Sequence, residues 1–133
     1  MSWLTKKKPP PIRSLVGEGM QVLGHIRFAE GLRIDGEVQG DVLATGEGRS
    51  IVVISEKARV LGKVKAGHVI INGEVRGPVF ADDLLELQPK ARVFGDVRYE
   101  LLEMHQGATV EGELKPLKSA EKPSLKLAAS NDA

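Results

Sequence analysis

A short motif recurs six times along this chain and restricts the folds that the chain can adopt. Each copy spans eight residues and is centred on an aliphatic–x–Gly–x–aliphatic pattern. The copies are GMQVLGHI (19–26), GLRIDGEV (31–38), KARVLGKV (57–64), HVIINGEV (68–75), KARVFGDV (90–97) and GATVEGEL (107–114). Their starts are 12, 26, 11, 22 and 17 residues apart. A period of about 17 residues, divided into sides of five or six, explains most of this spacing, and residues 46–50 are interpreted as a small insertion.

Within each copy the residues alternate in the manner of a half-buried strand. In residues 59–64, Val60, Gly62 and Val64 are expected to point one way and Leu61 and Lys63 the other. Glycine weakens a flat strand, but it suits a corner where the chain bends and a side chain would collide with its neighbours. The glycines assigned to such corners are Gly24, Gly36, Gly40, Gly62, Gly73, Gly77, Gly95 and Gly112.

Short strands joined by glycine corners, without helices between them, predict an all-β fold of the parallel β-helix type. About six triangular coils, stacked at about 4.8 Å, would stand roughly 30 Å tall. Aromatic residues make up only 4% of the chain, which suits a narrow interior filled by Val, Ile and Leu. The stretch ADDLLEL (81–87) is the closest approach to a helical pattern, and Pro89 ends it within two residues. We expect it to form a coil side with Leu85 and Leu87 inward and Glu86 outward.

An ordered series of motifs resembles one known family. The series consists of GLRIDGEVQGDV (31–42), INGEVRG (71–77), LQPKARVFGDVRY (87–99) and GATVEGEL (107–114). In this order the motifs are similar to those of the bactofilins, which are bacterial polymer-forming cytoskeletal proteins. The resemblance extends from about Ser14 to Leu114, nearly the whole glycine-bearing part of the chain.

The resemblance implies a right-handed triangular β-helix that polymerises end to end, without a nucleotide, into non-polar filaments. It also implies a location on the inner face of the cytoplasmic membrane. There the filaments would act as scaffolds for cell shape or appendages, and would localise cell-wall enzymes or polarity proteins. Bactofilins often carry a Phe associated with assembly in the last coil, in a GAxFEG-like context. This chain has Val110 at that position, so Leu102, Met104 or Leu114 would supply the apolar end.

The residues themselves also favour self-assembly. A solenoid ends in an unpaired strand edge, and most solenoids cover it with a polar cap. We expect no cap at either end of this body, because no amphipathic helix precedes Gly17 and only a Lys/Ala/Ser/Pro tail follows Leu114. Identical ends would then pair head to head and tail to tail, giving a homopolymer. The predicted contact residues are Val22 and Ile26 at one end, and Leu102, Met104, Val110 and Leu114 at the other; each equally fits a role in local packing alone.

Composition divides the chain into a body and two tails. All 15 glycines lie between Gly17 and Gly112. Residues 1–16 carry a charge of +4 and residues 115–133 a charge of +2, so the middle carries −5 within a total of +1. We therefore expect a disordered basic, proline-bearing tail at 1–13, a β-helix polymerisation domain at 14–115 and a disordered tail at 116–133.

The N-terminal tail combines apolar and basic residues in a way that suits a membrane surface. Trp3 favours the headgroup boundary, and Leu4 lies beside it. Lys6, Lys7 and Lys8 would each contribute on the order of 1 kcal/mol near an anionic surface. Display of many copies on one filament would strengthen a weak anchor. The alternative is a solvated tail without a partner. With no cysteine, no apolar run of membrane-spanning length and no signal sequence, we expect a cytoplasmic protein at the periphery of the membrane.

Other classes of function fit less well. The acidic body, whose aromatics are not interleaved with basic residues, argues against nucleic acid, and no phosphate-binding loop or metal motif indicates a cofactor. A β-helix acyltransferase could use a histidine, but the irregular spacing breaks the six-residue register of those enzymes. We expect His25, His68 and His105 to be solvated. Outward acid pairs such as Asp35/Glu37 and Glu111/Glu113 lack the cleft that acid–base catalysis requires. A monomeric binding scaffold remains the second alternative.

Overall fold

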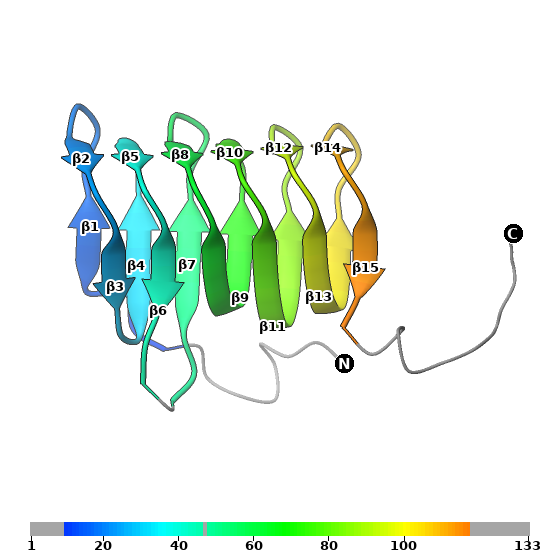
Figure 1. Ribbon diagram of the computed structural model, residues 1–133, viewed down its shortest axis with the longest axis horizontal. Coiled ribbons are helices and arrows are strands. Elements are labelled where there is room, and N and C mark those ends of the chain that lie inside the picture. Colours follow the sequence, from blue (N-terminus) through cyan, green and yellow to red (C-terminus); the bar gives the residue numbers. More distant parts are fainter. Residues whose placement is uncertain (1–9, 47, 118–133) are drawn as a thin grey trace, which may run out of the picture.

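The computed structural model describes residues 10–46 and 48–117, which form fifteen β-strands and no helix. The strands wind into a right-handed solenoid whose axis lies horizontally in Figure 1. All pairings between strands are parallel, and each strand pairs with its equivalents on the neighbouring coils. The predicted parallel β-helix of about six coils is therefore confirmed. We number the coils from the N-terminus as 14–30, 31–50, 51–67, 68–83, 84–100 and 101–117.

Each coil contributes one strand segment to each of three faces. Face 1 contains β1 (Ser14–Val16), β4 (Gly31–Ile34), β7 (Ile51–Ile54) and the C-terminal parts of β9 (Val64–Ile71), β11 (Val79–Leu87) and β13 (Val97–Met104). Face 2 contains β2 (Gln21–Leu23), β5 (Glu37–Gln39), β8 (Arg59–Leu61), β10 (Glu74–Arg76), β12 (Arg92–Phe94) and β14 (Thr109–Glu111). Face 3 contains β3 (Ile26–Phe28), β6 (Val42–Ala44), the N-terminal parts of β9, β11 and β13, and β15 (Leu114–Pro116).

The corner between faces 3 and 1 changes along the solenoid. In the first two coils the strands stop at this corner: β3 ends at Phe28 before β4 begins at Gly31, and β6 ends at Ala44 before β7 begins at Ile51, where the sequence predicted an insertion. In the later coils β9, β11 and β13 run through the corner without a break. The register of β11 shifts between Ala81 and Leu84 against both neighbours, because β11 has one more residue there than β9 or β13.

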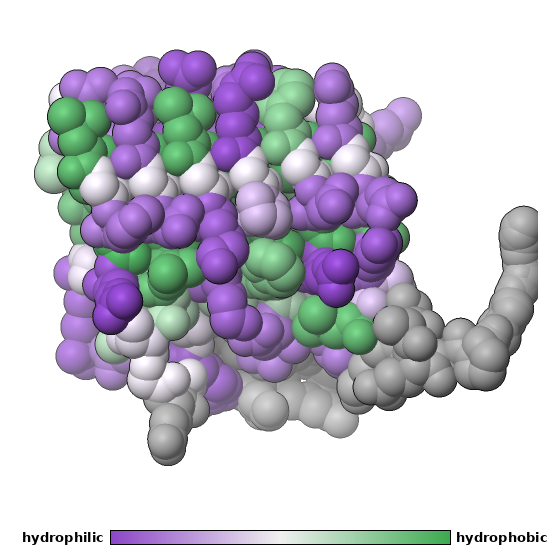
Figure 2. Space-filling model, viewed as in Figure 1, coloured by the Kyte–Doolittle hydropathy of each residue, from purple (hydrophilic) through white to green (hydrophobic). Residues whose placement is uncertain are grey.

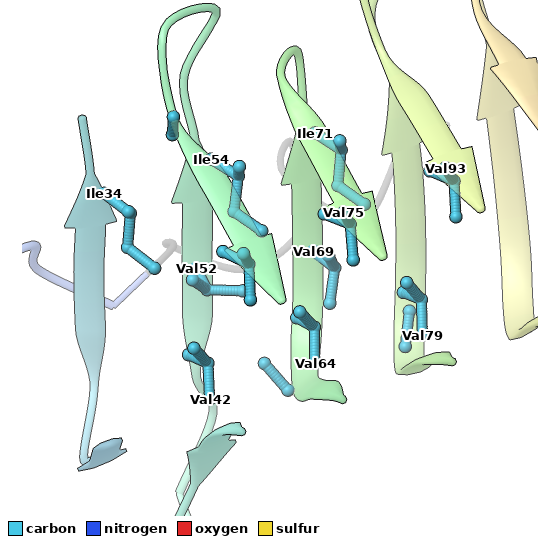
Figure 3. Close-up of a cluster of buried hydrophobic side chains, with 14 of the residues drawn as sticks. Ile34, Val42, Val52, Ile54, Val64, Val69, Ile71, Val75, Val79 and Val93 are labelled. Carbon is cyan, nitrogen blue, oxygen red and sulfur yellow. The ribbon is translucent and has the colours of Figure 1, made fainter. Parts of the chain in front are cut away.

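The interior consists of ladders of aliphatic side chains, one from each coil. Ile34, Ile54 and Ile71 occupy equivalent positions on successive coils, as Figure 3 shows, and all three are fully buried. Val42, Val64 and Val79 form a second ladder. Full burial of one such side chain contributes about 1.5–3 kcal/mol, so the ladders supply the main force that holds the coils together.

The expected inward and outward positions on residues 81–87 are confirmed. Leu85 and Leu87 are fully buried in the core, while Glu86 between them is only half-buried on the outer side. Residues 84–87 form the face 1 side of coil 5, and residues 81–83 lie at the corner that precedes it.

Six of the eight glycines assigned to corners form one continuous line. Gly24, Gly40, Gly62, Gly77, Gly95 and Gly112 lie between a face 2 strand and the face 3 strand that follows it. From Gly40 onward, a Cβ atom would collide with the carbonyl group of the glycine on the preceding coil. Gly36 and Gly73 lie at the corner between faces 1 and 2, where a Cβ atom would meet backbone oxygens of the preceding coil. These corners bring backbone directly against backbone.

The residues that follow the line of glycines help to satisfy backbone N–H groups. Asp41 Oδ1 accepts a hydrogen bond from the N–H of Lys63 at 2.9 Å, and Asp96 Oδ1 accepts one from the N–H of Glu113 at 3.0 Å. His25 Nδ1 accepts a hydrogen bond from the N–H of Asp41 at 3.0 Å. Each of these side chains therefore bridges to the next coil at a bend where the strand hydrogen bonds are interrupted.

Candidate assembly surfaces at the two ends

Both ends of the solenoid have strands that pair on one side only within the described residues. β1, β2 and β3 pair with β4, β5 and β6, respectively, and with no other described strand. At the opposite end β14 and β15 pair only with β12 and β13. Unpaired backbone N–H and C=O groups along such an edge can bind a further strand.

At the N-terminal end, Val22 and Ile26 are the first members of two interior ladders. Val22 lies against Val38 in register, and Ile26 against Val42, and both inner neighbours are fully buried. Val22 and Ile26 themselves are only half-buried although they pack on the core. The structure thus places both predicted residues at the end of the core, with one side uncovered by any described residue.

At the C-terminal end, the four predicted residues are the last members of the ladders. Leu102 and Val110 are half-buried and pack on the core, while Met104 is 43% exposed and Leu114 is 41% exposed. Their inner neighbours are almost completely buried: Leu85, Val93, Leu87 and Val97. No described strand pairs with the outer side of β14 or β15, so these side chains have no outer neighbour among the described strands.

Sequence analysis missed further exposed apolar residues of the end coils. Leu15, Met20 and Leu23 in coil 1 are 58%, 49% and 72% exposed, and Leu101 in coil 6 is 52% exposed. They lie at outward or turn positions, which the alternation alone assigns to the solvated wall. Their position in the first and last coils could have identified them as candidate contact residues, because an apolar residue there lies next to an end of the core.

The outer wall between the ends is crossed by polar contacts from coil to coil. On face 2 the Arg59 guanidinium lies 3.9 Å from the Glu37 carboxylate and 3.5 Å from that of Glu74, and Arg92 lies 3.7 Å from Glu74. The guanidinium of Arg76 stacks over the ring of Phe94 at 4.2 Å. Figure 2 shows hydrophobic and hydrophilic residues side by side on the face of the wall that is in view. Each contact contributes little to the stability of the fold by itself. Together the contacts connect neighbouring coils along the stacking direction.

One expectation about the histidines is wrong. His25 and His105 have side chains that are 70% and 48% exposed, as expected, but the side chain of His68 is completely buried. His68 Nε2 lies 3.7 Å from the Glu86 carboxylate, which also lies 3.7 Å from His105 Nε2. Burial lowers the pKa of His68, and the nearby Glu86 only partly opposes this effect. His68 was assigned to solvent because the alternation places it outward, and alternation does not reveal what covers the outside of the wall.

Some polar side chains of the outer wall gather in a hollow. A shallow hollow of about 450 Å³ is lined by residues that include Arg33, Asp35 and Ser55. The carboxylate of Asp35 accepts hydrogen bonds from the Ser55 hydroxyl and from Arg33 Nε, and these bonds lower its pKa. Asp35 is therefore held as an anion by neighbours on its own and the next coil. Within residues 10–46 and 48–117, no three His, Asp or Glu side chains gather into a set that could hold a metal ion.

The predicted membrane-targeting residues Trp3, Leu4, Lys6, Lys7 and Lys8 lie outside the described residues, as does the C-terminal tail beyond Leu117. The part of the chain that the structure describes contains no helix with the length and apolar character needed to cross a membrane.

Comparisons with known proteins agree on one family. Residues 14–115 match the model of the family named Bactofilin and described as polymer-forming cytoskeletal. Bactofilin BacO of Myxococcus xanthus (strain DK1622) is 26% identical over 101 residues, which are 76% of this chain and 77% of BacO. A cryo-EM reconstruction of Thermus thermophilus bactofilin double helical filaments is similar in structure, with a TM-score of 0.71 and 30% identity, covering 78% of this chain and 99% of that one. The chain therefore belongs to the bactofilins, a family of polymer-forming cytoskeletal proteins.

Proposed function

We propose that copies of this chain join end to end, N-terminal end to N-terminal end and C-terminal end to C-terminal end, into non-polar filaments that need no nucleotide. This proposal rests on the partly exposed hydrophobic core at each end of the solenoid. Ile26 and Val22 at one end, and Met104 and Leu114 at the other, continue buried ladders but have no outer neighbour among the described residues. Covering the part of each such side chain that is still exposed with a second copy would contribute roughly 1 kcal/mol.

Membership of a polymer-forming family supports assembly, and so does similarity to a bactofilin filament. Pairing of identical ends gives closed contacts with twofold symmetry, in which each end covers its own counterpart. Alternating the two contacts along a row of molecules yields a filament without overall direction. The filament would act as a cytoskeletal scaffold that organises cell shape or localises envelope and cell-wall factors.

Substitutions at one end at a time test the order of assembly. We expect Ile26→Asp to leave dimers joined through their C-terminal ends, and Leu114→Asp to leave dimers joined through their N-terminal ends. The double variant should be a monomer of 14.4 kDa. Sedimentation and negative-stain microscopy distinguish these species. Leu61→Asp, on face 2 in the middle of the wall, is the matched control and should still form filaments.

Two results would contradict the proposal. Monomers in both single variants would indicate head-to-tail growth, because one blocked end then stops every contact. Uniform monomers of the unaltered protein at tens of micromolar would favour a monomeric binding scaffold instead.

We also propose that the N-terminal residues Trp3, Leu4, Lys6, Lys7 and Lys8 attach the filament to the anionic inner face of the cytoplasmic membrane. Indole favours the headgroup boundary and the lysines favour anionic lipid. A filament presents many copies of this segment, so attachment gains from avidity. Deletion of residues 2–8 should abolish sedimentation with anionic vesicles while filaments persist, and unchanged sedimentation would reject the anchor.

We infer a scaffold without catalytic activity or a cofactor. The exposed histidines support this inference, because His25 lies in coil 1 and His105 in coil 6, at opposite ends of the stack. An acyl-transfer assay with acyl-CoA donors should give no activity above the background, and a rate that His105→Ala removes would overturn the inference.

A further inference from the structure

Two of the three methionines lie at opposite ends of the solenoid. Met20 belongs to coil 1 and is 49% exposed, and Met104 belongs to coil 6 and is 43% exposed. Within residues 10–46 and 48–117 they are the only methionines, and the buried core of this part of the chain consists of other residues. Methionine is therefore confined, in the described solenoid, to the two coils that are proposed to contact further copies.

Met104 ends an interior ladder of face 1 that otherwise contains only aliphatic hydrocarbon side chains. The strand register gives the members of this ladder in order: Val16, Ile34, Ile54, Ile71, Leu87 and Met104. Leu87, the inner neighbour of Met104, is fully buried. Met104 thus occupies the one position of the ladder that a contact between C-terminal ends would cover.

Met20 occupies a position that holds a small residue in every later coil. It directly precedes the face 2 strand, and the residues that precede the other face 2 strands are Gly36, Ala58, Gly73, Ala91 and Ala108. The preceding coil limits their size, since a Cβ atom on Gly36 would lie 2.5 Å from the carbonyl oxygen of Met20. No described coil precedes coil 1, so a long side chain fits there. The Met20 sulfur accepts a hydrogen bond from the N–H of Gly17 at 3.2 Å, which holds the sulfur at the end turn.

The two thioethers are the groups that peroxide oxidises most readily in the described solenoid, because the chain has no cysteine. Hydrogen peroxide transfers one oxygen atom to sulfur. The O–O bond breaks, an S=O bond forms, the sulfur gives up two electrons, and the second oxygen takes the proton of the first and leaves as water. The sulfoxide is polar whereas the thioether is apolar. Burial of the sulfoxide in an end contact without a hydrogen-bond donor would disfavour that contact.

We propose that Met20 and Met104 are oxidation sites at which sulfoxide formation opens the two end-to-end contacts. Oxidation of Met20 opens the contact between N-terminal ends, and oxidation of Met104 opens the contact between C-terminal ends. Methionine sulfoxide reductases remove the oxygen again, so the modification is reversible. This inference rests on the proposed end-to-end assembly. Inside a filament both thioethers are covered, so oxidation acts on copies that have dissociated and blocks their return.

Peroxide treatment of the full chain tests the proposal. Peptide mass spectrometry measures the oxidation of each methionine, and sedimentation with negative-stain microscopy measures assembly. We expect filaments to give way to monomers as Met20 and Met104 each gain one oxygen atom. The double variant Met20→Leu/Met104→Leu should form filaments before and after treatment. This variant keeps Met1, Trp3 and Tyr99, so it controls for oxidation elsewhere in the chain.

Addition of Leu61→Met to the double variant gives a matched control. It places an oxidisable thioether on face 2 in the middle of the wall, and its oxidation should leave the filaments intact. Filaments of the unaltered chain that persist when both Met20 and Met104 are fully oxidised would overturn the proposal. Equal loss of filaments in the double variant would also overturn it, because the effect would then come from another residue.

Single variants assign each methionine to its own contact. After peroxide, Met20→Leu should give dimers joined through their N-terminal ends, and Met104→Leu should give dimers joined through their C-terminal ends. Reductases specific for the two sulfoxide epimers, supplied together with a thiol, should restore filaments of the unaltered chain. Filaments that stay absent after both sulfoxides have been removed would indicate damage to the fold and would contradict the proposed switch.

Failure of this inference is distinguishable from failure of the proposed assembly. If the ends do not pair, Ile26→Asp and Leu114→Asp leave the filaments of the reduced protein unchanged. If the ends pair but oxidation does not control them, the reduced protein responds to those substitutions while the oxidised protein still forms filaments.

Discussion

The carbonyl oxygen of Gly77 lies 2.5 Å from the position that a Cβ atom on Gly95 would occupy. Real Cβ atoms do not approach backbone oxygen so closely, and Gly95 also has a φ of 150°, which side-chain-bearing residues rarely adopt. The two residues belong to consecutive coils at the same corner. The separation of the coils there is therefore compatible only with glycine.

Replacing Gly95 with alanine should destabilise the protein by about 3 kcal/mol or more, because either the corner must distort or the coils must separate. Gly48→Ala is the matched control, since Gly48 is exposed in the loop before β7 and a Cβ atom there meets nothing within 4 Å. Denaturant unfolding of both variants measures the difference. An equal effect of the two substitutions would mean that the corner tolerates a side chain.

Removing the carboxylate of Asp41 should lower the free energy of unfolding by about 1–2 kcal/mol, because the N–H of Lys63 then loses its hydrogen-bond acceptor at the corner. Asp41→Asn keeps an acceptor oxygen at the same place and should retain most of the stability that Asp41→Ala loses. Thermal unfolding of the two variants compares them directly. Equal losses would show that the charge, and not the hydrogen bond, is the stabilising feature.

The stability of the protein should fall as the pH drops below 6.5, the ordinary pKa of histidine, because burial lowers the pKa of His68 in the folded state. In that range the unfolded chain binds a proton that the folded chain excludes, so protonation favours unfolding. His68→Gln should flatten the dependence down to about pH 5, above the range in which carboxylates titrate. Unfolding free energies across this window provide the test, and the same slope in both proteins would refute it.

Filaments should lengthen as salt rises from about 0.05 M to about 0.5 M, because the proposed contact between C-terminal ends brings like charges together. The described residues of coil 6 include three carboxylates (Glu103, Glu111 and Glu113) and one lysine, Lys115, which pairs with Glu113 at 2.9 Å. Glu111→Gln should weaken this dependence. Light scattering at each ionic strength follows the effect, and shortening with salt would argue against this pairing.

The period-two pattern of the sequence predicted the interior correctly, as Leu85 and Leu87 illustrate. It succeeded because an interior position in a narrow solenoid accepts little besides an aliphatic side chain. It failed for His68, because burial on the outer wall depends on what lies over the wall rather than on the local pattern. Leu15 and Leu101 were missed for a related reason: alternation fixes the direction of a side chain but not how close it lies to an uncovered end.

The loop between β6 and β7 has a practical consequence. Gly48 and Arg49 are exposed, and a side chain added at Gly48 has open space around it. Extra residues on such a loop tip cost little in closure entropy and disturb no stacked strand. A fluorescent protein inserted after Gly48 would leave both ends of the rod clear, which a fusion at either terminus would not, and would allow the polymer to be followed in living cells.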